Sequence, residues 1–339
     1  MCANQVTPTT AAVEANTSKG EAVRFVRSAL IFTLIGLLFY GAVYAASERL
    51  VVRYGQTNKF YLVKQTPPTT YDYVILGASH AAALGYQDMT ERLEAQTGAR
   101  ILNLAIVGGG VAVNQLVFDY FLTRHQTRGL VYVVDSFAFY ARTWNEERLQ
   151  DTRLFLRAPF DWSLARLLFT RPETRSMALD YLSGFSKINN DDRFAPDVTS
   201  EESSRFTRTY RPVKQIDDQR IAYLYPSQID ESVFARYLQE FERLLTDAQR
   251  RGIRVLVVKP PIPERVISRI PGEEQFDQRL RTLLRRLEIP LHDFTHLENG
   301  DAHFFDTDHL NRDGVLSFFD SGLAPVLKAA SAATATPSR

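Results

Sequence analysis

The sequence predicts an α/β protein in which one parallel sheet lies between two layers of helices. Short apolar runs alternate along the chain with amphipathic stretches, which is the pattern of strands and crossover helices. The run LVYVV at Leu130–Val134 is continuous and β-branched, as a strand buried on both faces should be. The stretch Glu231–Arg251 carries apolar residues at three- and four-residue steps, and Gly252 then leads directly into IRVLVV at Ile253–Val258. Together these features predict a flavodoxin-like three-layer sandwich.

Five strands and five helices account for most of the predicted domain. The expected strands are Tyr73–Leu76, Arg100–Ile106, Leu130–Val134, Ile253–Val258 and Leu291–Phe294. The expected helices are Met89–Gln96, Val111–Arg124, Glu231–Arg251, Glu273–Leu287 and Gly314–Leu327. Residues 140–228 break the alternation after the third strand, so we expect an insertion there that is partly helical around Trp162–Phe169. Insertions at strand ends in such sheets often cover the ligand-binding site.

Composition excludes several classes of function. The 339 residues are 45% hydrophobic and 23% charged, which is typical of a globular protein. Lys and Arg number 40 against 39 for Asp and Glu, so no basic field predicts a nucleic-acid partner. The single cysteine, Cys2, excludes an intramolecular disulfide. His292, His296 and His303 surround the last strand without a familiar zinc spacing, so we expect no metal and no cofactor.

An uncharged apolar segment at residues 28–46 has the length of a membrane-spanning helix, about 28 Å. Lys19, Arg24 and Arg27 precede it, which by the positive-inside rule predicts a single-pass protein of the cytoplasmic (inner) membrane. Residues 1–27 would then form a cytoplasmic tail. After the anchor we expect an extracytoplasmic stalk (47–70), the α/β domain (71–329) and a disordered tail (330–339). A cleaved signal peptide remains an alternative.

The first candidate for chemistry follows the first strand, in the segment Leu76-Gly77-Ala78-Ser79-His80. Ligands bind beyond the carboxyl ends of the strands in open α/β sheets, so Ser79 stands where a nucleophile would. Gly77 permits a tight turn and leaves the backbone N–H of Ser79 free to donate. A Gly-x-Ser turn also occurs often without any function, so this segment alone leaves a purely structural turn open.

The second candidate is Asp306-Thr307-Asp308-His309-Leu310-Asn311, after the last strand. An Asp three residues before a His can accept the imidazole N–H, which leaves the other ring nitrogen facing a hydroxyl. In a flavodoxin-like strand order the loop after the last strand can lie beside the loop after the first. We therefore expect Ser79 and His309 to meet. The alternative is that Asp306 and Asp308 cap a helix and that His309 lies on the surface.

The third candidate is the glycine-rich stretch Gly108-Gly109-Gly110, which follows the second strand and leads into a helix. Its backbone N–H groups could approach a developing oxyanion. A phosphate-cradling loop is the alternative. The stretch lacks the Lys-Ser/Thr pair of a P-loop, and its glycine spacing differs from that of a dinucleotide fingerprint.

Taken together, the three segments resemble the SGNH (GDSL-type) hydrolase superfamily. The resemblance consists of Ser79 in a Gly-x-Ser turn, Gly108 in an Asn-x-x-x-x-Gly stretch and the C-terminal Asp306-x-x-His309, over about residues 72–327 without the insertion. The anchor, the Gly-Ala-Ser-His turn and the Asp-Thr-Asp-His-Leu-Asn ending look most like one branch of it. That branch contains membrane-anchored proteins of teichoic-acid D-alanylation and alginate acetylation, which work beside membrane-bound O-acyltransferases.

The resemblance implies that Ser79 is the nucleophile, His309 the general base and Asp306 its orienting partner. It places the oxyanion hole at the backbone N–H groups of Ser79 and Gly108. The chain would be an extracytoplasmic serine esterase or O-acyltransferase that acts on a glycan or other cell-envelope polymer through an acyl-serine. A membrane-bound O-acyltransferase would be its partner. The alternatives are a non-catalytic accessory subunit of such an acyltransferase and a plain glycan-binding module.

Two positions depart from the family's pattern. The family commonly has an Asn after the third strand as a further oxyanion donor, whereas this chain has Asp135. A carboxylate there would repel an oxyanion, so we expect Asp135 to orient a loop or to bind a hydroxyl. His80 departs from the common Gly-Asp-Ser turn and could tune Ser79 or contact substrate. His80, Asp135 and Asn311 are the expected substrate contacts.

Overall fold

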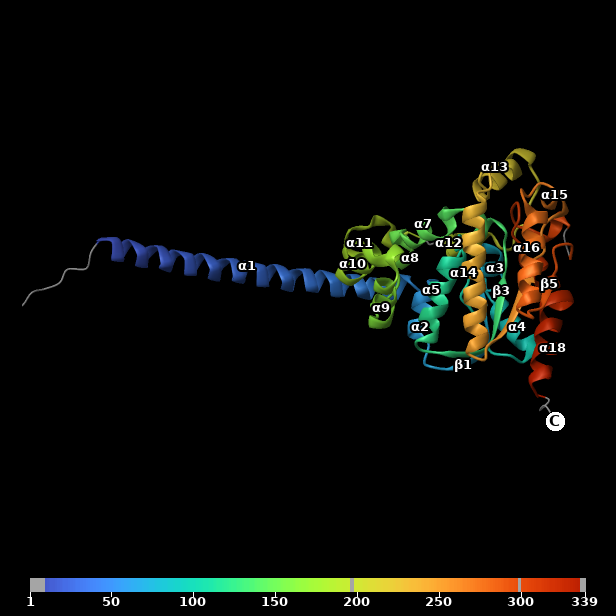
Figure 1. The fold of residues 1–339 in the computed structure, drawn as a ribbon, viewed down its shortest axis with the longest axis horizontal. Helices are drawn as coiled ribbons and strands as arrows, with labels where there is room; N and C mark the ends of the chain where they lie inside the picture. The colour runs from blue at the N-terminus through green and yellow to red at the C-terminus, as the bar shows by residue number, and fades with distance from the viewer. Residues whose placement is uncertain (1–9, 196–197, 298–299, 336–339) are drawn as a thin grey trace, which may run out of the picture. The chain divides into compact units, whose positions relative to one another are not determined.

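The computed structural model describes residues 10–195, 198–297 and 300–335. Five parallel strands form one sheet in the order β2-β1-β3-β4-β5, which is the flavodoxin-like order expected from the sequence (Figure 1). Every neighbouring pair runs parallel. The strands are β1 (Thr70–Leu76), β2 (Ile101–Asn103), β3 (Gln126–Val133), β4 (Arg254–Lys259) and β5 (Leu291–Asp293). The predicted fold class, including the insertion after the third strand, is confirmed.

The strand limits differ from the sequence prediction at three strands. β1 and β3 begin earlier, at Thr70 instead of Tyr73 and at Gln126 instead of Leu130, and β2 ends at Asn103 instead of Ile106. The chain leaves the regular ladder there to enter the glycine-rich loop. Two further bonds still follow β1, because Leu104 N donates to Ile75 O at 2.9 Å and Ile106 N donates to Gly77 O at 3.1 Å. These bonds carry the loop along the edge of the turn that contains Ser79.

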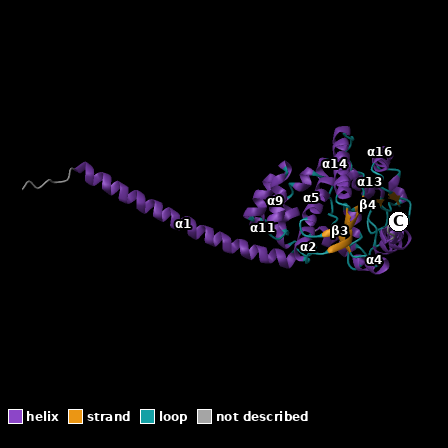
Figure 2. Ribbon diagram, turned by 60° about the horizontal axis from the view of Figure 1, so that its bottom comes forward, coloured by secondary structure: helices purple, strands orange, loops and turns teal. Residues whose placement is uncertain are grey.

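Successive residues of the central strands point to opposite faces, and each face has its own core. Val74, Tyr132 and Val257 belong to one core, whose helices are α5 (Val111–Leu122), α14 (Glu231–Arg250) and α16 (Glu273–Arg286). The intervening residues Ile75, Val131 and Val258 belong to the other. That second core is covered by α3 (Ser79–Ala83), α4 (Met89–Thr97) and the C-terminal helices. Figure 2 labels α5, α14 and α16 of the first layer and α4 of the second beside the strands β3 and β4.

The C-terminal segment is helical for longer than the sequence predicted. It consists of α17 (Arg312–Phe318), a π-helical turn (Phe319–Leu323) and α18 (Ala324–Ala335). Tyr73 Oη donates to Leu327 O at 3.0 Å and lies 2.9 Å from Ser331 Oγ, so the sheet holds the last turns. Residues 330–335 were expected to be disordered, but they form the last turns of α18. Residues 336–339 lie outside the described part.

The insertion is mostly helical and has two parts. Its first part contains what we call the α8–α11 lobe, which is formed by α8 (Thr152–Leu156), α9 (Trp162–Thr170), α10 (Arg175–Ser183) and α11 (Phe185–Asn189) (Figure 1). Its second part contains α12 (Val198–Arg205) and α13 (Lys214–Leu224). The insertion also contains α7 (Glu146–Leu149) and three 3₁₀ turns, at Arg142–Trp144, Pro172–Thr174 and Asp191–Phe194. The short helix α6 (Phe137–Tyr140) leads into it, whereas α15 (Glu264–Ile267) and the 3₁₀ turn Asp301–His303 lie after β4 and β5.

The N-terminal helix α1 covers Thr10–Tyr54 and includes the predicted anchor. Its segment Gly20–Tyr54 is long and apolar enough to cross a membrane, by length and composition. It also runs through most of the predicted cytoplasmic tail, of which residues 1–9 lie outside the described part, and through residues 47–54 of the predicted stalk. The chain up to Leu50 and the chain from Val51 are separate compact units. α2 (Lys59–Gln65) belongs to the second.

Candidate active site

Ser79 is the first residue of α3, directly beyond the carboxyl end of β1. Gly77 makes the turn with a φ of 147°. A Cβ at this position would lie 2.6 Å from Val133 O and 2.7 Å from Ala81 Cβ, so the turn requires glycine. Ser79 is 3% exposed, and its N–H belongs to the first turn of the helix, where no intrahelical acceptor exists.

One buried side chain ties the Ser79 turn to the glycine-rich loop. Asn114 of α5 is fully buried, and its Oδ1 accepts from Gly77 N at 3.0 Å. Its Nδ2 donates to Gly109 O at 3.1 Å and to Gly110 O at 2.9 Å. Asn114 was not predicted from the sequence, although an Asn within the apolar helix VAVNQLVF is a usable signal of a buried polar contact. The contacts bring together the two turns predicted to supply oxyanion donors, with Gly108 in a left-handed conformation (φ 68°).

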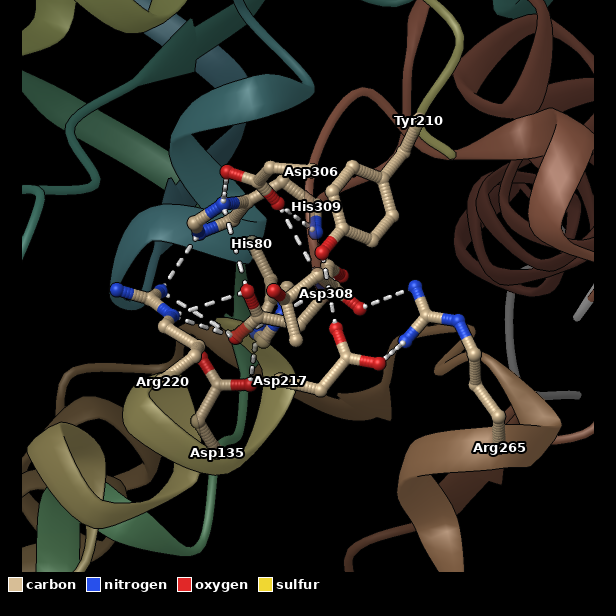
Figure 3. Close-up of polar contacts among 10 residues, drawn as sticks. His80, Asp135, Tyr210, Asp217, Arg220, Arg265, Asp306, Asp308 and His309 are labelled. Carbon is tan, nitrogen blue, oxygen red and sulfur yellow. Dashed lines mark hydrogen bonds and ion pairs between the residues drawn. The ribbon is translucent and has the colours of Figure 1, made fainter. Parts of the chain in front are cut away.

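The loop after β5 forms the predicted Asp–His pair (Figure 3). His309 Nδ1 lies 2.8 Å from Asp306 Oδ2, and the N–H groups of Asp308 and His309 donate to Asp306 Oδ1 at 3.1 and 2.9 Å. His309 is 1% exposed, which excludes the alternative of a surface histidine. The residue that caps α17 is Asn311, whose Oδ1 accepts from Gly314 N, so Asp306 and Asp308 are not its caps.

The two loops converge, and their contact is made by His80, the residue after Ser79. His80 Nε2 lies 3.1 Å from Asp308 O, and the ring centroids of His80 and His309 are 5.0 Å apart. Segments separated by 228 residues are therefore adjacent. Among the hydrogen bonds of the described residues, none joins Ser79 to His309.

The two departures from the family pattern, His80 and Asp135, pair with each other. His80 Nδ1 lies 2.6 Å from Asp135 Oδ1, and its Nε2 faces Asp308 O, so both ring nitrogens face oxygen acceptors (Figure 3). Burial lowers the pKa of His80, but the carboxylates of Asp135 and Asp308 outweigh it and leave the pKa raised. An imidazolium that donates from both nitrogens satisfies both of these contacts. Asp135 thus orients His80.

Arg220, from the insertion helix α13, was not predicted and completes the cluster. Its Nε donates to Asp308 Oδ1 at 3.0 Å and its Nη2 to Asp308 Oδ2 at 3.2 Å. Nη2 also lies 3.3 Å from His309 Nε2 (Figure 3). A guanidinium can only donate, so this contact requires an unprotonated Nε2. Arg220 therefore occupies the nitrogen that would take the serine proton.

Opposing effects set the protonation of His309. Burial lowers its pKa, but the carboxylates of Asp306 and Asp308 reverse this and raise the pKa of His309 to about 10. The Arg220 contact acts against protonation, because it is lost when Nε2 carries a proton. Burial raises the pKa of Asp306, but the charge and hydrogen bonds of His309 outweigh it and hold that pKa well below its usual range.

His80, Asp308 and His309 form the one group of described residues whose ligand atoms, within 4.8 Å of one another, could hold a metal ion. The guanidinium of Arg220 is already bonded to both Asp308 and His309. The positive charge of Arg220 therefore already lies beside these ligand atoms in the described conformation. The absence of a metal cofactor stays a sequence-based prediction.

A small cavity lies beside His80 at the carboxyl ends of β3 and β4. Its volume is about 30 Å³. It is lined by aliphatic and aromatic side chains and by polar or charged ones, which are His80, Asp135, Ser136, Arg220, Lys259, Glu273, Thr307 and Asp308. Asp135 Oδ2 is buried without a hydrogen-bond partner among the described residues. Asn311 does not line the cavity, and its amide donates to Ala302 O and Arg208 O. Of the three expected substrate contacts, Asn311 is thus committed to the fold.

A scan against protein-family models matched none, and a search of curated proteins found no similar sequence. Among solved structures, the chain is similar to a Bacteroides fragilis protein described as a candidate acylhydrolase, with a TM-score of 0.42 and 10% identity over 79% of this chain and 93% of that one. It is also similar to a protein described as a candidate platelet activating factor from Streptococcus pneumonia, with a TM-score of 0.40 and 11% identity over 91% and 99%. Similarities at this level carry no functional argument.

Proposed function

We propose that this chain is a membrane-anchored serine esterase or O-acyltransferase of the SGNH (GDSL-type) superfamily. The observation that carries the proposal is the convergence of the β5 loop with the β1 turn, which sets the Asp306–His309 pair against His80, next to Ser79. A serine and a carboxylate-oriented imidazole at the carboxyl edge of a parallel sheet are the groups that acyl transfer through a covalent intermediate requires.

The reaction would proceed in two displacements. Ser79 Oγ attacks an ester carbonyl while His309 Nε2 takes its proton, and the N–H groups of Ser79 and Gly108 stabilise the oxyanion. Collapse breaks the ester C–O bond and releases an alcohol, which takes the proton from His309. Water or a second hydroxyl then attacks the acyl-Ser79 ester by the same steps in reverse order. Exclusion of water from the cleft would favour transfer over hydrolysis.

Arg220 sets a condition on this mechanism. Its Nη2 must leave His309 Nε2 before the serine proton can be transferred, because one lone pair cannot accept from both donors. Substrate that rotates the Arg220 guanidinium away from His309 Nε2, while its bond to Asp308 is kept, would free the base. The described conformation corresponds to a closed resting site in this scheme.

The remaining parts of the proposal concern place and substrate. The apolar helix Gly20–Tyr54, preceded by Lys19, supports an anchor in the cytoplasmic membrane with the α/β domain outside. There the site would face a glycan or another cell-envelope polymer, beside a membrane-bound O-acyltransferase partner. An anchored domain would keep the acyl-serine close to both.

Labelling of Ser79 in the full chain tests the proposal. Incubation with p-nitrophenyl acetate should add an acetyl group to the peptide that carries Ser79, as measured by mass spectrometry. Ser79→Ala should abolish this label and lower ester hydrolysis by at least about 10³-fold. Ser204→Ala, in α12 on the insertion, is the matched control and should behave as the wild type. Turnover by Ser79→Ala at the wild-type rate would disprove the proposal.

A non-catalytic accessory subunit of a membrane-bound O-acyltransferase is the second candidate. Two observations favour it: Arg220 covers His309 Nε2, and Asp135 stands where the family commonly has an oxyanion donor. For this candidate, the Ser79→Ala and His309→Ala variants should still co-purify with the acyltransferase and support polymer modification. The catalytic proposal instead requires loss of modification with the complex intact.

A further inference from the structure

The α8–α11 lobe exposes large apolar side chains. On α9, Trp162 is 72% exposed and Phe169 is 40% exposed. With the exposed Arg166 they follow the i, i+4, i+7 spacing, which places all three along one stripe of the helix. Leu179 of α10 and Phe185 of α11 are also exposed, at 63% and 60%. This lobe therefore carries a concentration of exposed apolar residues that the domain core does not use.

Positive charge accompanies this apolar surface. Arg166 and Arg175 are both exposed, and neither makes an ion pair within the part of the chain that the structure describes. The nearby acids are engaged elsewhere. Glu173 lies 3.9 Å from Arg236, and Asp180 Oδ1 accepts from the backbone and hydroxyl of Ser186. Aromatic rings with unpaired arginines beside them suit the interface of an anionic bilayer.

The lobe also packs on the segment through which the chain enters the domain from α1. Asn58 Nδ2 donates to Leu154 O at 3.2 Å, and the Lys64 amine contacts Phe160 O. A Cβ at Gly55 would lie only 2.9 Å from Arg157 O, so the backbones of residues 55 and 157 are in direct contact. The segment at residues 55–64 that contacts the lobe therefore follows directly after the apolar helix in the chain.

We propose that the exposed stripe of α9, together with the exposed apolar side chains of α10 and α11, docks on the surface of the bilayer that anchors the chain. Trp162 and Phe169 insert at the level of the headgroups, and Arg166 and Arg175 contact anionic lipid phosphates. The inference requires the N-terminal helix to be an uncleaved anchor, but it does not depend on the chemistry of Ser79. Such docking fixes the tilt of the α/β domain, and so the height of the strand ends above the membrane.

The tryptophan content makes this testable in the full chain. The only two tryptophans are Trp144, which is 6% exposed and donates to Leu224 O, and Trp162. The protein is reconstituted in vesicles of phosphatidylethanolamine and phosphatidylglycerol whose acyl chains carry bromine, a contact quencher. Trp162 emission should shift to the blue and be quenched, and Trp162→Phe should remove the quenchable component while Trp144 emission persists.

Three variants separate lipid contact from other causes. In the Trp162→Phe background, Tyr223→Trp moves the reporter to an exposed position on α13 and should not be quenched. Arg166→Glu with Arg175→Glu should weaken the quenching of Trp162, whereas Arg211→Glu, an exposed arginine outside the lobe, should not. Wild-type emission that is no more quenched than that of Trp162→Phe would overturn the proposal. A blue shift without quenching would do so as well, because it indicates a protein partner on this face.

Discussion

The electrostatics around His309 can be tested by the isosteric substitution Asp308→Asn. Asp308 Oδ1 lies 3.7 Å from His309 Nδ1, and the same carboxylate holds Arg220. Asn keeps the size of the side chain and the backbone carbonyl that His80 contacts, but it removes the negative charge. Two effects then lower the pKa of His309. An attractive anion is lost, and the charge of Arg220 beside His309 Nε2 is no longer neutralised by the Asp308 carboxylate.

The size of the change follows from the distance. Two unit charges 3.7 Å apart interact by about 1.1 kcal/mol at the dielectric constant of water and by about 4.5 kcal/mol at an effective value of about 20. At about 1.4 kcal/mol per pKa unit, these limits correspond to about 0.8 and about 3 units. Because Arg220 already neutralises part of the Asp308 charge, we expect the pKa of His309 to fall by about one to two units from its raised value of about 10.

The direction of the change in the pH profile follows from the role of His309 as a base. His309 accepts the serine proton only when neutral, so kcat/KM for ester hydrolysis should rise with pH through the pKa of His309, and Asp308→Asn should move this rise to lower pH. A titration of the His309 ring by NMR measures the same pKa without turnover. Asp301→Asn is the matched control, because Asp301 follows β5 as Asp308 does, but its carboxylate pairs with Arg265 of α15. An unchanged or increased midpoint in Asp308→Asn would refute the reasoning.

Three further outcomes are expected from the same contacts. Gly77→Ala should lower the free energy of unfolding by about 2–4 kcal/mol in urea titrations, against about 1 kcal/mol for Gly98→Ala, which has open space around it. Arg220→Ala leaves the carboxylate of Asp308 buried without its guanidinium partner and should lower the free energy of unfolding by about 3–5 kcal/mol. Arg220→Lys should restore only part of this stability. The raised pKa of His309 contributes stability that is complete below its unfolded value of 6.5 and is lost as pH rises toward about 10. Urea titrations over this range should show that decline, and His309→Gln should flatten it.

The sheet was predictable because its strands are buried on both faces. LVYVV and IRVLVV are short and nearly continuous apolar runs, without the alternation of apolar and polar residues that an amphipathic helix shows. The helix before the second run is followed by a glycine, which marks the start of the strand. The end of β2 was not predictable, since Leu104–Ile106 continue the apolar run while the backbone turns into the loop. In the insertion, α9 matches the helix predicted around Trp162–Phe169. Most of the other helices there are shorter than ten residues and depend on tertiary contacts such as Trp144 Nε1 to Leu224 O, so no periodic pattern reveals them.

The parts of the candidate site differ in the same way. The Asp306–His309 pair was predictable because three residues of spacing determine its geometry. The His80–Asp135 pair spans 55 residues, and the Arg220–Asp308 pair spans 88, so both depend on topology that local patterns do not contain. His80 and Asp135 were each noticed as departures from a family pattern. Only the structure shows that they are one interaction.

The cluster also constrains how Arg220 can release the base. If Arg220 withdrew completely, Asp308 would lose its main cation, and its charge would favour a proton on His309, 3.7 Å away. Withdrawal would therefore expose Nε2 and protonate it at once, which defeats its use as a base. Rotation avoids this conflict, because Nε can keep its 3.0 Å bond to Asp308 while Nη2 swings away from Nε2. A working site should therefore retain the Arg220–Asp308 ion pair and break only the contact to His309.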